Sequence, residues 1–517
     1  MHVHAVLVVQ CLGALVSASS EISSSRSIRQ YLHPSSHGIA WIDCSSENDT
    51  PGLQCANITV PLDYRKPNSG RHATLGLMRR LVRNSSKRVG TLFFNPGGPG
   101  AIASNELIGS GSGLMPFSDD LRDHFDIVAM DPRGVGISQQ VRCDASLYNT
   151  AIRMNPYPGD QVAFDQIYDA WQAFGRSCAD MTGELLANVD SVTTARDFDF
   201  VRAALGEEDF NFLGLSYGVV LGAAYAELFP ERVRTLALDG AVDRTLSQPY
   251  LVLQDSQSNE ATLEKFFQWC DRNTDCAVRN TSFPTSSLYR DLASRASHHP
   301  LTALSCQSPS SNCFRTVSAS DIYLRTQVLL NVAERPRNSN LTPTSWFALG
   351  KALHAAYYNN DASAFSSDHF RFDNQTGALG SIAIWCLDVD RTITTFEQLT
   401  NLQHLLNSTS PYTSGQTEAY TYMLQCMAWP HPVVYPDNRF HFDAQKLPPA
   451  LIVNALYDPE ASYAWAVGVA NAMPHSRLLT RDGAGHTSYL LGGEARDLTD
   501  RYLITKVLPP PGTVVHS

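Results

Sequence analysis

A serine between two glycines is the pattern in this 517-residue sequence that points most directly to chemistry. Gly214-Leu215-Ser216-Tyr217-Gly218 follows a run of apolar β-forming residues and precedes small residues that favour a helix. The pattern G-x-S-x-G is typical of a sharp turn from a strand into a helix, in which only glycine tolerates the crowding beside the serine. It predicts that Ser216 is a nucleophile held at such a turn.

A serine hydroxyl is too weak an acid to attack a carbonyl carbon unaided, so it needs an imidazole base and a carboxylate that orients the base. After such a turn the partners follow in the order Ser, then Asp or Glu, then His. Asp458 follows the apolar run "LIVNALY", and His486 ends "GAGH" after the next short run. We therefore expect Ser216, Asp458 and His486 to form a catalytic triad. We disfavour Asp482 as the acid because it lies on the same loop as the base.

Acyl transfer also needs donors for the negative charge that develops on the carbonyl oxygen. Preorganised backbone N–H groups stabilise this charge by about 3 kcal/mol each. One donor should be the amide of Tyr217, the residue after the serine. The other should come from the glycine-rich turn "NPGGPG" at residues 95–100, where we favour Gly98 and then Gly97.

The elements around these residues alternate between strands and helices. Short apolar runs that end at turns predict buried strands at residues 91–95, 125–130 and 235–240. Helical spacing predicts helices at residues 191–206 and 219–229. This alternation predicts a parallel sheet covered by helices on both faces, with ligands gathering at the carboxyl ends of the strands.

The secondary-structure pattern of the sequence changes in its middle part. From about residue 245 to residue 449, amphipathic helical stretches are broken by polar loops that carry cysteines, with no alternation of strands and helices. Strand patterns resume at residue 450. We therefore divide the chain into a core at residues 41–244 and 450–517 and an inserted helical cap at residues 245–449.

Charge and the N-terminal sequence restrict the partners and the compartment. The net charge is −11 and no run of lysine or arginine occurs, so we expect neither nucleic acid nor an anionic membrane as partner. Residues 1–18 predict a cleaved signal peptide, followed by a flexible leader at residues 19–40. No later segment is apolar over the 18 or so residues that a membrane span needs. We expect a secreted monomer.

Cysteines and glycosylation sequons agree with an oxidising secretory route. If Cys11 leaves with the signal peptide, ten cysteines remain; we disfavour zinc because no C-x-x-C pair occurs, and we expect no metal. The expected near-neighbour disulfides are Cys44–Cys55, Cys143–Cys178, Cys270–Cys276, Cys306–Cys313 and Cys386–Cys426. The N-glycosylation candidates are Asn48, Asn57, Asn84, Asn280, Asn340, Asn374 and Asn407.

Several motifs together resemble a known family. They are "VPLDYRKP", "FFNPGGPG", "DPRGVGIS", "GLSYGVVLGAAYAELFPERV" with "LDGAVD", "WCDRNTDCA", "IWCLDVD", "CMAWP" and "YDPE" with "GAGH". From about residue 40 to residue 490 the chain is similar to the secreted tripeptidyl aminopeptidases, which are α/β-hydrolases related to prolyl aminopeptidases and carry a TAP-like C-terminal region. The resemblance implies an α/β-hydrolase fold with a large cap. It also implies a serine exopeptidase that needs no cofactor and uses Ser216, Asp458 and His486.

The sequence departs from the family pattern at two places. Residues 101–104 read Ala-Ile-Ala-Ser where the family continues with more glycine and serine. The acid loop reads Asp458-Pro459-Glu460-Ala461-Ser462 where the family has D-P-V-T-P or a close variant. The catalytic aspartate is retained, so these departures bear on the substrate rather than on the reaction.

The substrate therefore stays open between a peptide and a small ester. An aminopeptidase must bind a protonated α-amine with a carboxylate in a partly dry pocket, and Asp388 and Glu260 are the candidates in the cap. Without such a group, the same triad would serve an esterase or lactonase. A third possibility is a binding protein without catalysis, which would be expected to have a broken triad or oxyanion turn.

Overall fold

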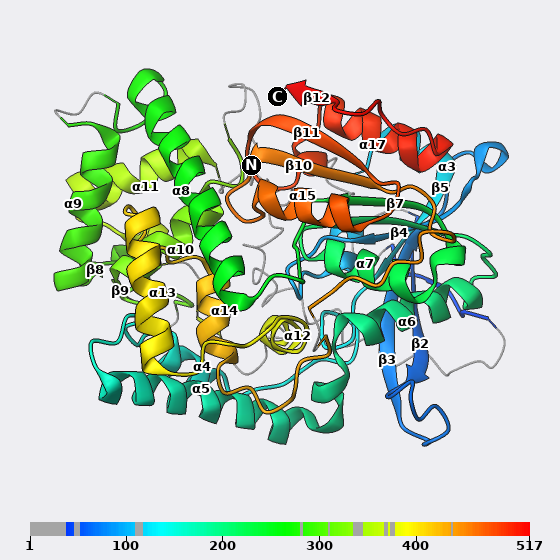
Figure 1. Cartoon of the computed structure of the whole chain (residues 1–517), viewed down its shortest axis with the longest axis horizontal. Coiled ribbons are helices and arrows are strands. Elements are labelled where there is room, and N and C mark those ends of the chain that lie inside the picture. The colour runs from blue at the N-terminus through cyan, green and yellow to red at the C-terminus, as the bar shows by residue number, and fades with distance from the viewer. Residues whose placement is uncertain are drawn as a thin grey trace.

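The structure is a computed structural model with a mixed sheet at its centre (Figure 1). It describes residues 38–45, 52–108, 117–279, 283–308, 311–333, 345–366, 371–372, 378–435 and 438–516. The predicted signal peptide and most of the predicted leader lie outside these residues.

Ten strands form the sheet among the described residues, in the order β1-β2-β3-β5-β4-β6-β7-β10-β11-β12. The strands from β5 to β12 in this order are parallel, and the first three are antiparallel. Their bounds are β1 Ile42–Asp43, β2 Leu53–Pro61, β3 His72–Arg80, β4 Gly90–Asn95, β5 Phe125–Met130, β6 Phe210–Leu215, β7 Val233–Asp239, β10 Leu451–Tyr457, β11 Arg477–Ala484 and β12 Val514–His516. The predicted parallel sheet is confirmed.

Helices cover both faces of the sheet. On one face lie α6 (Ser191–Ala204), α7 (Gly218–Leu228) and α15 (Tyr463–Ala472), and on the other lie α2 (Ala103–Ile108), α3 (Asp119–His124), α16 (Ser488–Leu491) and α17 (Glu494–Thr505). Neighbouring residues of β4 illustrate the two cores, because successive side chains of a strand point to opposite faces. Phe93 packs with Phe198 of α6, whereas Phe94 packs with Phe117 at the start of the α3 segment.

A helical cap lies beside the sheet (Figure 1). The segment between β7 and β10 folds into α8 (Gln248–Arg272), α9 (Thr285–His298), α10 (Ala319–Leu329), α11 (Trp346–Tyr358), α12 (Gly380–Asp388), α13 (Phe396–Thr409) and α14 (Glu418–Cys426), with a small sheet of β8 (Leu301–Thr302) and β9 (Thr316–Val317). Short 3-10 turns lie at Ser85–Lys87, Gly183–Asn188, Pro230–Arg232, Leu304–Cys306 and Ser363–Phe365.

Two helices from the stretch that we had assigned to the core join the cap. They are α4 (Ala145–Ala151) and α5 (Gln161–Thr182), which pack against each other, and α5 also contacts α14. Asn149 of α4 exchanges hydrogen bonds with the backbone of Phe372, far along the chain. The helical layer therefore draws on two separate segments of the sequence.

Five disulfides stabilise the fold. They join the same five pairs that the sequence analysis predicts, Cys44–Cys55, Cys143–Cys178, Cys270–Cys276, Cys306–Cys313 and Cys386–Cys426. Of the candidate sequons, Asn57, Asn84 and Asn407 lie within the described residues, and the side chain of Asn407 is exposed on α13. Asn48, Asn280, Asn340, Asn374 and Cys11 lie outside them. Within the described part of the chain, no helix has the length and apolarity to cross a bilayer.

Candidate active site

Ser216 occupies a tight turn between β6 and α7. Its φ of 55° lies in the left-handed region that residues other than glycine rarely adopt. The glycines beside it are required by close packing. A Cβ atom at Gly214 would lie 2.6 Å from the carbonyl oxygen of Gly218, and one at Gly218 would lie 2.8 Å from that of Asn95. The cap buries the turn, so Ser216 is only 2% exposed.

The glycine-rich turn after β4 lies against this serine turn. A Cβ atom at Gly97 would lie 2.7 Å from Cβ of Ser216 and 3.0 Å from the backbone N of Tyr217. The N–H of Gly97 donates to Asn95 Oδ1 at 3.0 Å, so its donor is already used. The N–H of Gly98 makes no hydrogen bond to any other described residue. This geometry favours Gly98 over Gly97 as the second oxyanion donor beside Tyr217.

Asp131 braces the segment that follows the glycine-rich turn. Its carboxylate accepts hydrogen bonds from the backbone N of Ser104 at 2.9 Å, Ser104 Oγ at 2.8 Å and the backbone N of Ile137 at 2.9 Å. Burial outweighs these donors and raises the pKa of Asp131 to about 6. Residues 101–104, which depart from the family pattern, are therefore held in place by the hydrogen bonds between Ser104 and Asp131, the first residue of the "DPRGVG" motif.

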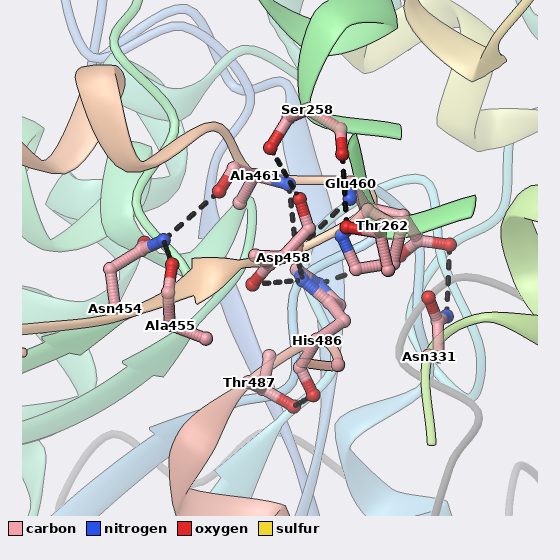
Figure 2. Close-up of polar contacts among 12 residues, drawn as sticks. Ser258, Thr262, Asn331, Asn454, Ala455, Asp458, Glu460, Ala461, His486 and Thr487 are labelled. Carbon is pink, nitrogen blue, oxygen red and sulfur yellow. Dashed lines mark hydrogen bonds and ion pairs between the residues drawn. The ribbon is translucent and has the colours of Figure 1, made fainter. Parts of the chain in front are cut away.

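His486 and Asp458 are bonded to each other at the ends of β11 and β10 (Figure 2). His486 Nδ1 lies 2.8 Å from Asp458 Oδ1 and 3.0 Å from Oδ2, so Nδ1–H donates to the carboxylate. Asp458 Oδ1 also accepts from the backbone N–H groups of Glu460 and Ala461, at 3.0 and 2.9 Å. Asp482 Oδ2 lies instead 3.3 Å from Nδ1 of His516 on β12, the edge strand of the sheet.

The backbone brings His486 next to the serine turn. The N–H of Ser216 donates to the carbonyl oxygen of Asp239 at 2.7 Å. A Cβ atom on Gly240, the following residue, would lie 3.1 Å from His486 Cε1. The imidazole nitrogen Nε2 has no hydrogen-bond partner among the described residues, and catalytic hydrogen bonds are often long before substrate binds.

Glu460 is a functional candidate that the triad pattern alone did not identify. Its Oε2 atom lies 3.5 Å from His486 Nε2, and its Oε1 atom accepts from Asn331 Nδ2 at 2.9 Å. The signal in the sequence was its place in the acid loop, two residues after Asp458, where the resembled family has valine. The side chain is 2% exposed, and Oε2 has no hydrogen-bond partner in the described part of the chain.

Two further carboxylates lie close to Glu460. Asp255 of α8 is buried, and Glu418, the first residue of α14, is partly buried. Gln327 of α10 links the three segments, because its Nε2 lies 3.4 Å from Asp255 Oδ1 and 2.9 Å from the carbonyl oxygen of Pro459, while its Oε1 accepts from the backbone N of Glu418 at 2.8 Å. We call Asp255, Glu418 and Glu460 the carboxylate cluster.

Burial and like charge disfavour ionisation of the carboxylate cluster. Burial raises the pKa of all three groups, to about 8 for Asp255 and about 7 for Glu460 and well above the ordinary range for Glu418, and the charge of Glu460 adds to the shifts of the other two. Asp255 Oδ2 and Glu460 Oε2 have no hydrogen-bond partner among the described residues. Within the described ranges, no group of three or more His, Cys, Asp or Glu side chains is arranged to hold a metal ion. The cluster therefore holds two carboxyl oxygens without a partner among the described residues, and one of them, Glu460 Oε2, lies close to the base.

The electrostatic surroundings also act on the base. Burial lowers the pKa of His486, but the charges of Asp458 and Glu460 outweigh it and raise the pKa to about 9. The imidazolium is therefore strongly stabilised in the free protein.

The two carboxylates that we had predicted for amine binding are engaged by protein donors. Asp388 of α12 accepts from the backbone N and Oγ of Ser191, at 3.0 and 2.9 Å, and from the hydroxyl of Tyr217. Glu260 of α8 accepts from the backbone N of Tyr412 at 2.6 Å and from Thr413 Oγ1 at 3.2 Å. Both carboxylates thus already accept hydrogen bonds from the protein, and their role in amine binding stays a prediction.

Comparison with known proteins agrees with the fold described above. A family model described as the alpha/beta hydrolase fold matches residues 90–493, and the chain therefore belongs to the alpha/beta hydrolase fold family. It is 29% identical to serine protease Hip1 of Mycobacterium tuberculosis, over 92% of this chain and 90% of that protein. It is 28% identical to tripeptidyl aminopeptidase of Streptomyces coelicolor, over 90% and 84% of the two chains.

A third relative carries a different name. The chain is 30% identical to carboxylesterase B of Mycobacterium tuberculosis, over 91% of this chain and 88% of that protein. The three similarities confirm the resemblance that the sequence motifs predict, and the protein is an enzyme of the serine hydrolase class.

Proposed function

We propose that the protein is a serine exopeptidase that releases short N-terminal pieces from peptides with a free α-amine. The observation that carries this proposal is the carboxylate cluster next to His486, with Glu460 Oε2 only 3.5 Å from Nε2. An ammonium group is the ligand that unpaired, buried carboxylate oxygens favour, because it donates charge-assisted hydrogen bonds and neutralises the buried charge. The names of two relatives, serine protease Hip1 and tripeptidyl aminopeptidase, support peptides as the substrate class.

The reaction proceeds in two steps. Ser216 Oγ attacks the scissile carbonyl carbon and gives its proton to His486 Nε2, and the N–H groups of Tyr217 and Gly98 stabilise the oxyanion. The C–N bond then breaks, and the same proton passes from Nε2 to the leaving nitrogen, which frees the shortened peptide. Water attacks the acyl-enzyme, its proton passes through His486 to Ser216 Oγ, and the N-terminal piece leaves as an acid.

A carboxylic-ester hydrolase is the second candidate. The relative named carboxylesterase B favours it, and the triad and oxyanion turn would serve it equally well. The carboxylate cluster favours the peptidase, because an uncharged ester has no group that would pair with it. The intact triad residues disfavour the non-catalytic binding protein.

The disulfides support an oxidising compartment, and we propose that the protein is exported with cleavage after about residue 18. N-terminal sequencing of protein purified from the culture medium tests this proposal; a mature chain that begins with Met1 would refute it.

Labelling with a fluorophosphonate tests the enzyme class. Wild-type protein should be labelled at Ser216, and Ser216→Ala should be neither labelled nor active. Asp482→Asn is the matched control, because this rival acid is paired with His516, and its activity should equal that of the wild type. Labelling of another serine, or activity in Ser216→Ala, would refute the proposed nucleophile.

A further inference from the structure

His486 lies between two carboxylates that act on it differently. Asp458 holds Nδ1 and so orients the ring, which is the role expected of a triad acid. Glu460 Oε2 lies 3.5 Å from Nε2, the atom that must take the proton of Ser216. A carboxylate at this distance stabilises the protonated ring, and a protonated ring cannot act as a base. In the free enzyme, Glu460 therefore opposes the reaction that His486 is placed to perform.

The other charges around the ring do not relieve this opposition. Asp239 at the end of β7 is a third carboxylate that raises the pKa of His486, and the charge of Glu460 raises the pKa of Asp255 on α8 and of Glu418 on α14. Arg481 of β11 donates to Ser488 Oγ and to the carbonyl oxygens of Ala484 and Gly485. Glu460 Oε2 has no hydrogen-bond partner among the described residues, so a cationic substrate group can pair with it.

On the basis of the proposed function, we infer that Glu460 makes His486 a better base toward substrates with an ammonium group than toward substrates without one. In the free enzyme, Glu460 attracts the imidazolium and keeps Nε2 protonated. When the ammonium group of a substrate pairs with Glu460, this attraction is lost, and the added positive charge disfavours a second cation beside it. His486 then loses its proton and can accept the one from Ser216. Selection of free N-termini would therefore act through the chemical step as well as through binding.

The position of Glu460 in the acid loop makes this coupling direct. Its backbone N–H donates to Asp458 Oδ1, so the loop that orients His486 through Asp458 also carries the competing carboxylate. Asn331 fixes the same group from the cap, since its Nδ2 donates to Glu460 Oε1 and its backbone oxygen accepts from the N–H of His486 at 2.9 Å. The Glu460 carboxylate and the His486 ring are thus held in fixed relative positions by the acid loop and by Asn331 of the cap.

The test compares Glu460→Gln with wild type on two substrates, a free-amine peptide anilide and an N-acetylated amino-acid ester. Glutamine keeps the size and removes the charge. For the ester, kcat/KM at pH 7 should rise about tenfold, and the acidic limb of its pH profile should move down by about one pH unit. For the free-amine anilide, kcat/KM should fall about tenfold or more. Glu207→Gln is the control and should change neither substrate, because Glu207 accepts from Thr91 Oγ1 at 2.7 Å at the amino end of β4, the opposite end of the strand from the site.

A second measurement keeps the inference testable if the variant does not fold. In Ser216→Ala protein, NMR titration of His486 should show a lower pKa when alanine amide is added, and no change with N-acetylalanine amide. An equal loss on both substrates in Glu460→Gln, an unmoved pH limb, or no shift with alanine amide would overturn the inference. The proposed function would survive any of these results, whereas it would fail if wild-type protein did not cleave free-amine peptides.

Discussion

At the residue scale, the buried carboxylates link the site to the stability of the protein. Burial, together with the charge of Glu460, raises the pKa of Asp255 to about 8 in the folded state. The folded protein then keeps a proton that the unfolded chain has already lost, so the free energy of unfolding falls as pH rises from about 4 to about 8. The stabilisation that comes from the protonated Asp255 carboxyl is therefore present at acidic pH and is lost as the pH rises to about 8.

We therefore predict that Asp255→Asn raises Tm at pH 8 by about 2 °C or more and leaves Tm at pH 4 unchanged. Differential scanning calorimetry at the two pH values checks this prediction. The expected cost is a lower rate on free-amine substrates, because function and stability compete at such a site. An equal change of Tm at both pH values would show that packing, and not ionisation, explains the effect.

At the element scale, the junction of β6 and α7 determines where the nucleophile stands. Gly214 lies where the strand meets the first turn of the helix, and an added Cβ would lie 2.6 Å from the carbonyl oxygen of Gly218 and 2.5 Å from the ring of Phe212. Both neighbours belong to the packed core, so they cannot move without displacing the serine turn.

Gly214→Ala should therefore destabilise the protein by about 2 kcal/mol and lower kcat more than it raises KM. Thermal unfolding and steady-state kinetics measure both effects. Gly159→Ala is the matched control, since no atom lies within 4 Å of its Cβ position, and it should behave like the wild type. A Gly214→Ala enzyme with wild-type kcat would contradict the close packing that we describe.

At the scale of the whole molecule, one disulfide links two cap helices that both contact the site. Cys386–Cys426 joins α12 to α14 across 40 residues of chain. Asp388 of α12 accepts from the hydroxyl of Tyr217 beside the nucleophile, and Glu418 begins α14. This bond therefore connects the helix that supports the serine turn with the helix that supplies part of the carboxylate cluster.

Replacing both cysteines by serine, Cys386→Ser with Cys426→Ser, should lower the free energy of unfolding by about 4 kcal/mol and reduce activity. The pair Cys306–Cys313 spans 7 residues, and its removal should cost about 2 kcal/mol with activity unchanged. Denaturant unfolding and rates on one substrate provide the comparison. An active, equally stable Cys386/Cys426 double variant would refute a link between this bond and the site.

The positions of Ser216, Asp458 and His486 could be predicted from the sequence, because each follows an apolar run in the expected order. They follow β6, β10 and β11, which are parallel strands of one sheet, so local patterns place them at the same sheet edge, and their catalytic roles stay predictions. The strands β1 to β3 were not predicted, because polar and partly buried residues interrupt the apolar positions of β2 and β3, and β1 is only two residues long.

The carboxylate cluster could not be predicted, because its members lie far apart in the sequence. Asp255 lies more than 150 residues before Glu418, and the two meet through the packing of α8, α10 and α14. For the same reason the protein donors that Asp388 and Glu260 contact could not be predicted. Their donors, Ser191 and Tyr412, come from segments 197 and 152 residues away and are invisible in the local sequence.

The central claim is that Ser216 attacks the carbonyl of a substrate whose free amine pairs with the carboxylate cluster. The most direct measurement compares rates on a tripeptide anilide, its N-acetylated form and a simple acyl ester, for wild-type protein and Ser216→Ala. We predict cleavage of the free-amine anilide by wild type at least about a hundredfold faster than of the acetylated form, and no activity in the variant. Turnover of the ester alone, or equal rates on both anilides, would contradict the account.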